Sequence, residues 1–352
     1  MNLQEILGKA TEKAASDVHL AVGSSPLMRV NGKLIPITET VLQVADMDKI
    51  VQEHVSNKER ALLLSDGETD FSYEDESGRY RVNLFRERMG YAAAFRVIGA
   101  RIPSFRELGL PSVMESFTRL RKGLVLITGP TGSGKTTTLA SMIDRINEEQ
   151  EGHIITLEDP VEYLHHHKKS LISQREIHRD SKGFAEALRA SLRQDPDVIL
   201  VGEMRDLDTI GTAITAAETG HLVLSTLHTS SAAQTVDRII DVFPPHQQAQ
   251  IRLQLSMVLE GVVSQKLIPK ADGSGRVAAF EIMTGTTGVR NLIREGKVHM
   301  LQTLIQTGAS SGMISMDSSI LALYREKVIT KESAVAFALD QETMKKQIFG
   351  LF

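Results

Sequence analysis

The sequence predicts an α/β protein of two domains: a small α+β domain, then a larger domain built on a parallel sheet. Three observations lead to this prediction. The chain has 352 residues, enough for about two domains at ~150 residues each. Short strand-like runs dominate its first part. From residue 112 onward, apolar β-branched runs alternate with helical patterns, as in a parallel sheet covered by helices on both faces.

The composition is that of an ordinary globular chain. Hydrophobic residues make up 41% and charged residues 24%, and the formal net charge is −4. This balance gives no bulk attraction to nucleic acids or anionic lipids, so we expect no nucleic-acid partner. The absence of cysteine excludes disulfides, thiolate zinc sites, Fe–S clusters and cysteine nucleophiles. No apolar run reaches the ~20 residues of a transmembrane segment and no signal-peptide pattern is present, so we expect a cytoplasmic protein.

We place the first domain at residues 1–100 and a linker at 101–111, where Pro103 and Pro111 interrupt the pattern. Apolar residues at helical spacing predict the first helix. The pair Asn31-Gly32 predicts a hairpin turn. The elements expected here are helices at 2–14 and 46–64 and strands at 27–30, 34–37, 68–73, 80–85 and 92–98.

The second domain, at 112–352, starts with a helix at Ser112. Its continuous apolar runs predict strands, and we expect the chain beyond residue 245 to be mainly helical, with a break at 269–275. The strands are predicted at 124–128, 153–157, 198–201 and 222–226, and the helices up to 146 and at 182–194, 206–219, 245–263, 286–294, 297–306, 315–326 and 331–340.

A glycine-rich loop that follows the strand at 124–128 matches G-x-x-x-x-G-K-[ST] at every fixed position. A helix follows it, as phosphate binding requires. The loop residues are Gly129, Pro130, Thr131, Gly132, Ser133, Gly134, Lys135, Thr136 and Thr137. Backbone N–H groups here would cradle the phosphates of ATP or GTP, with Lys135 bridging the β- and γ-phosphates and Thr136 ligating Mg²⁺. The alternative is a glycine-rich turn with an incidental lysine.

Three acidic residues and one histidine follow other strands of this sheet. Glu203 ends a run that begins at Asp197 and continues with four apolar residues. Between the last of these and Glu203 lies Gly202, at the position where many P-loop enzymes have an Asp. We expect Glu203 to orient and polarise the attacking water, although it can also be an ordinary surface acid. Glu158 is a candidate for the Mg²⁺ shell or for water activation. Asp159 is as readily a turn former before proline.

His228 follows the strand at 222–226 and could sense the γ-phosphate, although a lone histidine is more often structural. A second histidine group, His165-His166-His167, suggests a metal site. Three adjacent histidines on one loop do not converge easily on one ion, which favours a solvated loop.

Taken in order, these segments resemble the type II/IV secretion ATPase superfamily, and within it the pilus retraction branch. The segments are GPTGSGKTTT (129–138), ITLEDPVEY (155–163), RQDPDVILVGEMRD (193–206) and TGHLVLSTLHTSSA (219–232), with SDVHL (16–20) near the start and VRNLIRE (289–295) near the end. The last resembles the AIRNLIRE signature of retraction motors, with Gly288 and Val289 in place of Ala and Ile. The alternative for that segment is an amphipathic core helix that buries Leu292 and Ile293.

The resemblance implies a PAS-like N-terminal domain, a RecA-like ATPase domain with C-terminal helices, and a homohexameric ring. It supports Glu203 as the catalytic glutamate, Glu158 as an essential acid and His228 as a site residue. It also implies that arginines of the N-terminal domain complete the site; Arg81, Arg86 and Arg96 are the candidates, unless they are plain surface residues.

The function that the resemblance implies is an Mg²⁺-dependent ATPase that powers pilus retraction and twitching motility. Domain closure on ATP would act on a PilC-like platform protein at the inner face of the membrane, and a PilU-like paralogue is a further expected partner. Lack of cysteine argues against the extension and secretion branches, which usually carry a tetracysteine zinc subdomain. A nucleic-acid translocase and a nucleotide-binding scaffold without turnover are the rival functions.

Overall fold

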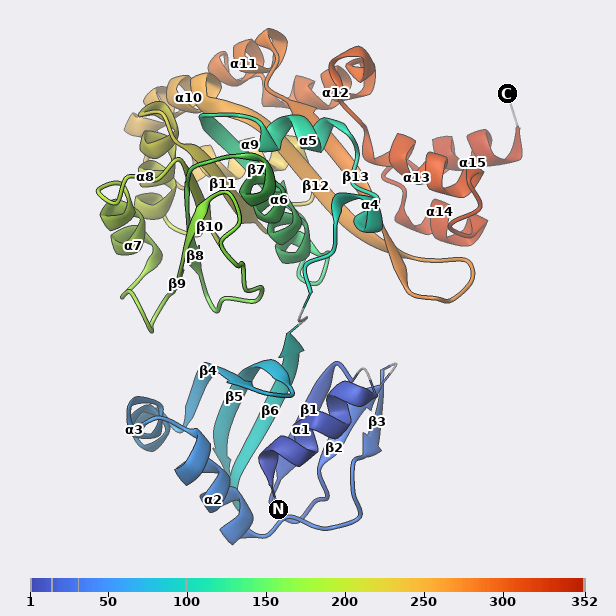
Figure 1. Ribbon diagram of the computed structural model, residues 1–352. Helices are drawn as coiled ribbons and strands as arrows, with labels where there is room; N and C mark the ends of the chain where they lie inside the picture. Colours follow the sequence, from blue (N-terminus) through green and yellow to red (C-terminus); the bar gives the residue numbers. More distant parts are fainter. Residues whose placement is uncertain (1, 14, 31, 99–100, 351–352) are drawn as a thin grey trace. The chain divides into compact units, whose positions relative to one another are not determined.

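The computed structural model describes residues 2–13, 15–30, 32–98 and 101–350, which fall into two compact units (Figure 1). The first unit comprises Met1–Arg101 with Pro160–Leu164, and the second comprises Ile102–Asp159 with His165–Phe352. Two predicted landmarks lie outside the described residues: the turn residue Asn31 and residue 100, where the first domain was expected to end. Each unit is described by itself.

The described residues of the first unit form a six-stranded sheet in the order β3-β2-β1-β6-β5-β4, with every neighbouring pair antiparallel. Helix α1 buries the apolar face that its sequence predicts. The central strand β1 was not predicted. The single helix expected at 46–64 is two helices, because Ser56 caps a new helix with Glu59. The elements are α1 Leu3–Glu12, β1 Asp17–Ala21, β2 Leu27–Val30, β3 Lys33–Pro36, α2 Val44–His54, α3 Asn57–Asp66, β4 Glu68–Asp75, β5 Gly78–Glu87 and β6 Gly90–Ile98.

The second unit contains a seven-stranded sheet in the order β13-β12-β7-β11-β10-β8-β9. All of its pairs are parallel except β12–β13 at one edge. Its elements are α4 Phe105–Leu108, α5 Val113–Thr118, β7 Gly123–Thr128, α6 Lys135–Glu149, β8 His153–Glu158, β9 Leu171–Glu176, α7 Phe184–Ser191, β10 Val198–Val201, α8 Leu207–Glu218, β11 Leu222–Leu227, α9 Ala232–Asp241, α10 Pro245–Val258, β12 Leu259–Pro269, β13 Arg276–Thr284, α11 Thr287–Arg294, η1 Val298–Met300, α12 Leu301–Thr307, η2 Ala309–Ser311, α13 Met316–Arg325, α14 Lys331–Phe337 and α15 Gln341–Phe349.

The sheet of the second unit has a hydrophobic core on each face. One face packs apolar side chains against α7 to α12, and the other packs against α5 and α6. Alternate residues of β7 divide between the two: Leu124 and Leu126 face the first core, and Val125 and Ile127 face the second. Because both faces are covered, the central strands β7, β10 and β11 are buried throughout and largely apolar, as the sequence predicts. Within the described part of the chain, no helix combines the length and apolar character that crossing a bilayer requires.

The prediction for the chain after residue 245 was wrong in one respect. The helix expected at 245–263 ends at Val258, and strands β12 and β13 follow it. The expected break at 269–275 is the turn between these two strands. The β-branched segment after Leu259 is buried on both faces, which removes the alternation that would have distinguished a strand from a helix. Edge strand β9 and helices α9 and α15 were also not predicted.

Part of the predicted linker belongs to the second unit. Ile102 is the first residue of that unit, and α4 forms at Phe105–Leu108 with Ser104 as its cap. Phe105 is buried in the core that covers α6. An aromatic side chain placed shortly after Pro103 therefore anchors this segment instead of leaving it extended.

The start of β12 gives a test of this packing. Its register against β7 shifts between Leu259 and Gly261, and a Cβ on Gly261 would lie 2.4 Å from Cζ of Phe117. We expect Gly261→Ala to lower the free energy of unfolding by ~1–3 kcal/mol, because the aromatic ring has to move. Urea unfolding measures the change.

The matched control is Gly211→Ala in the interior of α8, where the added carbon meets nothing closer than 3.8 Å. Alanine favours a helix over glycine, so this variant should gain up to ~1 kcal/mol. Equal stability of the two variants would contradict the packing described for Gly261.

Candidate nucleotide-binding site

The candidate site lies at the carboxyl edge of the parallel sheet in the second unit. The glycine-rich loop joins β7 to α6, Glu158 is the last residue of β8, Glu203 follows β10 and His228 follows β11. These four strands are neighbours in the order β7-β11-β10-β8. Parallel strands present their carboxyl ends at one edge, where α/β proteins bind ligands. The structure thus brings together residues that are up to a hundred positions apart in the sequence.

The loop backbone uses glycine where other residues would not fit. Gly132 and Gly134 have φ of 77° and 88°, in the left-handed region, and Gly134 caps α6. At Gly129 a Cβ would lie 2.4 Å from the carbonyl oxygen of Gln265. The loop therefore passes close to β12 and leads straight into the amino end of a 15-residue helix, the arrangement that binds phosphate.

Lys135 is the first residue of α6 and is only 8% exposed. Its Nζ donates hydrogen bonds to the carbonyl oxygens of Gly129 at 2.8 Å and Pro130 at 3.1 Å, so the ammonium group lies over the loop. Burial lowers the pKa of Lys135, and the negative charge of Glu203 opposes this shift. The positive charge that phosphates would meet is thus held by the loop itself.

Glu203 is the centre of a charged cluster. Its Oε2 accepts from Nη2 of Arg205 at 2.6 Å, and its Oε1 lies 3.3 Å from Nε2 of His228. Burial raises the pKa of the Glu203 carboxyl, but the hydrogen bond from Arg205 and the charges of His228 and Arg205 outweigh it and hold the pKa below its ordinary value. The lowered pKa keeps the Glu203 carboxylate ionised at neutral pH, and its 20% exposure leaves it reachable by water.

His228 connects this carboxylate to the phosphate loop. Its Nε2 faces Glu203, and its Nδ1 lies 3.5 Å from Oγ1 of Thr131, a hydrogen bond whose donor depends on the imidazole tautomer. A change at the loop can therefore reach the carboxylate through one side chain. The role of His228 in sensing the phosphate stays a prediction.

Gly202 explains the departure from the usual P-loop pattern. Its N–H donates to the carbonyl oxygen of Leu157 at 2.7 Å, and a Cβ at this position would lie 3.1 Å from the same oxygen. The chain thus leaves little room beside β8 for the Asp that many P-loop enzymes carry here. Glu158 and Glu203 are two carboxylates that the structure places at this edge.

Glu158 and Thr136 fit the donor set of a magnesium site. Glu158 is 8% exposed, and its Oε1 accepts from Thr156 at 2.7 Å and from Gln174 at 3.3 Å. Thr136 is half-buried in the first turn of α6. Carboxylate and hydroxyl oxygens are the hard ligands that Mg²⁺ takes beside nucleotide phosphates. The side chain of Asp159 is 47% exposed, and its Oδ2 lies 3.9 Å from Nε2 of the exposed His178.

Comparison with known proteins identifies the family of this chain. A family described as "Type II/IV secretion system protein" matches residues 1–348. The chain belongs to this family. The predicted fold class and the predicted P-loop ATPase class are therefore confirmed for this member of the family.

Individual members of the family are similar over nearly the whole chain. The "Type IV pilus retractation ATPase PilT" of Pseudomonas aeruginosa is 48% identical over 95% of this chain and 97% of its own length. The "Type IV pilus ATPase PilU" of the same organism is 38% identical, over 96% and 89% respectively. A crystal structure of the pilus retraction motor PilT with bound ADP superimposes with a TM-score of 0.92 at 46% identity, covering 98% of this chain and 99% of that one.

One residue of the charged cluster around Glu203 was not singled out from the sequence. Arg205 makes the shortest contact to Glu203, yet it was only part of the quoted motif RQDPDVILVGEMRD. Its position two residues after the glutamate is a usable signal, because side chains two apart on an extended segment point the same way. The sequence alone does not tell an ion pair at the site from a surface arginine.

The three candidate arginines lie in the first unit, on paired strands. Arg81 of β5 is directly opposite Arg96 of β6. Within this unit, Nε of Arg96 donates to Asp17 at 3.1 Å and Nε of Arg81 lies 3.8 Å from Asp70. Arg86, near the end of β5, is exposed. Their role at a nucleotide stays a prediction.

The histidines at 165–167 lie on the loop before β9, and they differ in burial. His166 and His167 are exposed, while His165 is half-buried. Burial lowers the pKa of His165 to about 4, so its ring is neutral at physiological pH. Nδ1 of His167 accepts from the Ile172 N–H at 3.1 Å. The sequence predicted a solvated loop, whereas the structure shows one that is partly packed.

The segment that resembles the retraction signature forms α11. Val289 and Ile293 are buried in the core and Leu292 is partly buried, as an amphipathic core helix requires. Arg290 has a further role: its Nη1 donates to the carbonyl oxygens of Ser256 at 3.1 Å and Met257 at 2.6 Å, at the end of α10. It also binds Glu260 and the carbonyl of Gly285.

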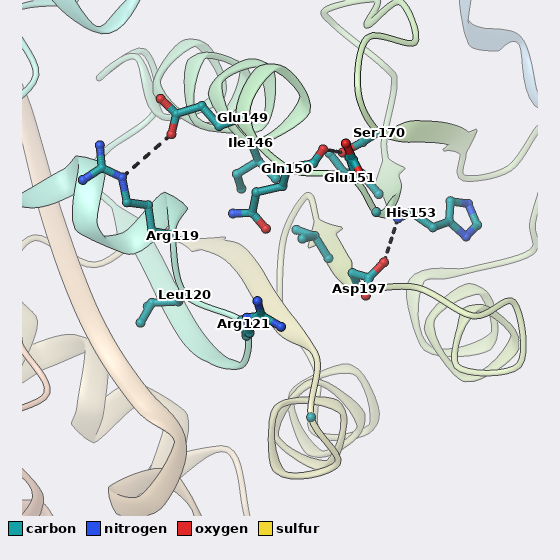
Figure 2. Close-up of a pocket in the computed structure, with 14 residues that line it drawn as sticks. Arg119, Leu120, Arg121, Ile146, Glu149, Gln150, Glu151, His153, Ser170 and Asp197 are labelled. Carbon is teal, nitrogen blue, oxygen red and sulfur yellow. Dashed lines mark hydrogen bonds and ion pairs between the residues drawn. The ribbon is translucent and has the colours of Figure 1, made fainter.

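A cavity of about 760 Å³ lies at the opposite edge of the same sheet (Figure 2). Its walls include the segments that precede β7, β8, β10 and β11 and the first residues of β8 and β10; Arg119, His153 and Asp197 are among them. Figure 2 shows Arg119 beside Glu149 and Asp197 bound to the backbone of His153. The amino ends of the strands face this cavity, so it is not the site described above.

Proposed function

We propose that this chain is an ATP-hydrolysing motor that powers type IV pilus retraction. The observation that carries the proposal is the ionised Glu203, which is held beside the phosphate loop through His228. The similarity to a relative named as a pilus retraction ATPase, over nearly the full length of both chains, supports the pilus role. This chain is 48% identical to PilT and 38% identical to PilU of the same organism, which favours the role of the principal retraction motor over that of its paralogue.

The proposed chemistry follows from the positions of the side chains. The backbone of the loop binds the phosphates, and Lys135 turns from the loop carbonyls to the β- and γ-oxygens. Glu203 accepts a hydrogen bond from the attacking water and orients it in line. Thr136 and Glu158 would hold Mg²⁺, which when bound neutralises charge on the phosphates. An arginine among Arg81, Arg86 and Arg96 would stabilise the transferring phosphoryl group.

The proposed assembly is a homohexameric ring of a PAS-like N-terminal domain and a RecA-like domain. ATP would close the two domains around the nucleotide, and hydrolysis would release them. These closures would displace a PilC-like platform protein, with the ring at the inner face of the membrane. A PilU-like paralogue would act beside it, and the α11 segment would couple the movement to retraction.

Deletion of the gene in the host tests the direction of the motor. We expect the deletion strain to lose twitching and to carry surplus surface pili, because pili still assemble but are not withdrawn. The wild-type gene should restore motility and Glu203→Gln should not. A bald deletion strain would point to extension and would contradict the proposal.

The pKa of Glu203 predicts the pH dependence of hydrolysis. A carboxylate whose pKa is lowered keeps its charge to lower pH, so the loss of kcat/KM on acidification should begin below the ordinary glutamate pKa of 4.5. Arg205→Ala removes the hydrogen bond that lowers this pKa, and the acid limb should move to higher pH. Arg189→Ala, which removes an exposed arginine of α7, is the control and should leave the profile unchanged. An unmoved limb in Arg205→Ala would contradict the role of this ion pair.

A further inference from the structure

Three buried polar residues of the β12–β13 hairpin lie on two successive levels of the sheet. Ser264 of β12 is paired with Glu281 of β13, and Gln265 is paired with Phe280. Successive side chains of a strand point to opposite faces, so Ser264 and Glu281 share one face and Gln265 lies on the other. We call Ser264, Gln265 and Glu281 the polar rung.

On one face, Gln265 holds the phosphate loop. It is 3% exposed; its Nε2 donates to the carbonyl oxygen of Ser133 at 2.7 Å, and its Oε1 accepts from Oγ1 of Thr138 at 2.9 Å. One amide thus joins the end of the loop to the first turn of α6. A Cβ on Gly134 would lie 2.9 Å from the same Nε2, which shows how closely the loop lies on this amide.

On the other face, Ser264 and Glu281 hold two further segments. Oγ of Ser264 and Oγ1 of Thr128, the last residue before the loop, are 2.8 Å apart. Glu281 is 0% exposed, and its Oε1 accepts from the Ala232 N–H at 2.8 Å, at the start of α9. Its Oε2 accepts from Gln302 of α12 at 3.4 Å. A carboxylate at the amino end of a helix is favoured by the helix dipole, which offsets part of the cost of burying it.

The start of α9 continues directly into the loop that carries His228. Ser231 caps the helix, Oγ1 of Thr229 and Oγ1 of Thr235 are 2.7 Å apart, and the Ser230 N–H donates to Gln234 at 3.2 Å. The three residues after His228 are therefore held to α9 by hydrogen bonds, and the amino end of α9 is held by a hydrogen bond to Glu281. The side chains of the rung reach the phosphate loop on one face and the histidine loop on the other.

We infer that Gln265 and Glu281 are positioning residues, through which the C-terminal hairpin sets the phosphate loop and His228 in their working arrangement. This inference rests on the proposed function, because the consequence is measured on nucleotide binding and hydrolysis. Neither side chain contacts the reacting atoms. Gln265 acts through Ser133 and Thr138, and Glu281 acts through the amino end of α9.

The first test concerns Gln265. Gln265→Met keeps the volume but leaves the Ser133 carbonyl and the Thr138 hydroxyl without this partner, so we expect about tenfold weaker binding of fluorescent ADP. Phe280→Leu changes an apolar side chain of the same level and face, and should lower the urea midpoint without weakening ADP binding. Unchanged ADP affinity in Gln265→Met, or an equal loss in Phe280→Leu, would overturn the role of Gln265.

The second test concerns Glu281. Glu281→Gln keeps an oxygen that accepts from the Ala232 N–H and should hold kcat near the wild-type value. Glu281→Met removes that acceptor, and we expect kcat to fall about tenfold with KM unchanged. In a His228→Ala background, Glu281→Met should cause no further loss, because its effect passes through the histidine. A full additional loss in that background, or a Gln variant as impaired as Met, would overturn the role of Glu281.

Failure of the proposed function gives a different result. If the wild-type chain bound ADP but released no phosphate from ATP, the proposed motor would fall, while the ADP affinities would still decide the role of Gln265. If the wild-type chain hydrolyses ATP, but Gln265→Met behaves like Phe280→Leu and Glu281→Met behaves like Glu281→Gln, the proposed function stands and only the inference about the polar rung fails.

Discussion

Glu203→Gln is expected to reduce kcat for ATP hydrolysis by at least ~100-fold while nucleotide binding is kept. The amide has nearly the shape of the carboxylate and can still accept from Arg205, which lies 2.6 Å from Oε2. It carries no charge with which to polarise water, and it cannot take up a proton. Steady-state phosphate release gives kcat, and fluorescent ADP titration gives the affinity.

Glu151→Gln is the matched control for this variant. Glu151 is exposed and lines the cavity at the opposite edge of the same sheet, so the same change of charge is made far from the site. We expect unchanged kcat in this control. Turnover of Glu203→Gln close to that of Glu151→Gln would reject Glu203 as the residue that activates water.

Lys135→Ala is expected to weaken nucleotide binding on the order of 100-fold or more. Each charge-assisted hydrogen bond contributes roughly 1.5–3 kcal/mol, and this lysine can make one to each of two phosphates. The variant also leaves the carbonyl oxygens of Gly129 and Pro130 without their present donor. Titration with fluorescent ADP and ATP measures the loss, and circular dichroism checks that the total helix content is kept.

Lys168→Ala separates this effect from a general change of charge. Lys168 binds Asp144 and Glu148 on the outer face of α6, so it lies beside the same helix but makes only surface ion pairs. Its removal should leave nucleotide affinity unchanged. Comparable affinities for Lys135→Ala and Lys168→Ala would contradict the placement of Lys135 at the phosphates.

The sequence predicted those parts of the site that depend on local pattern. The glycine-rich loop needs a strand before it and a helix after it, and both are local features, so the loop and Lys135 were predicted together. The positions of Glu203 and His228 followed from the rule that parallel strands share a carboxyl edge. The structure adds that His228 lies between Glu203 and Thr131, which no spacing in the sequence reveals.

The features that were missed depend on contacts between distant segments. Strands β12 and β13 are buried on both faces over much of their length, so their sequence lacks the alternation that distinguishes a strand from a buried helix. Gln265 and Glu281 were therefore not assigned to strands of the sheet. Their contacts to Ser133 and Ala232 depend on that assignment and could not be predicted. The arginines of the first unit were identified only as candidates, because their action depends on how domains come together.

Arg290 has a consequence for genetic work on the retraction signature. The guanidinium of Arg290 in α11 donates hydrogen bonds to the end of α10 and to Glu260 at the start of β12. Replacing Arg290 would therefore disturb folding as well as any coupling to the pilus. A loss of twitching in such a strain would confound the two causes. Asn291 and Arg294 are exposed on the same helix, and alleles altered there would separate a mechanical defect from an unstable protein.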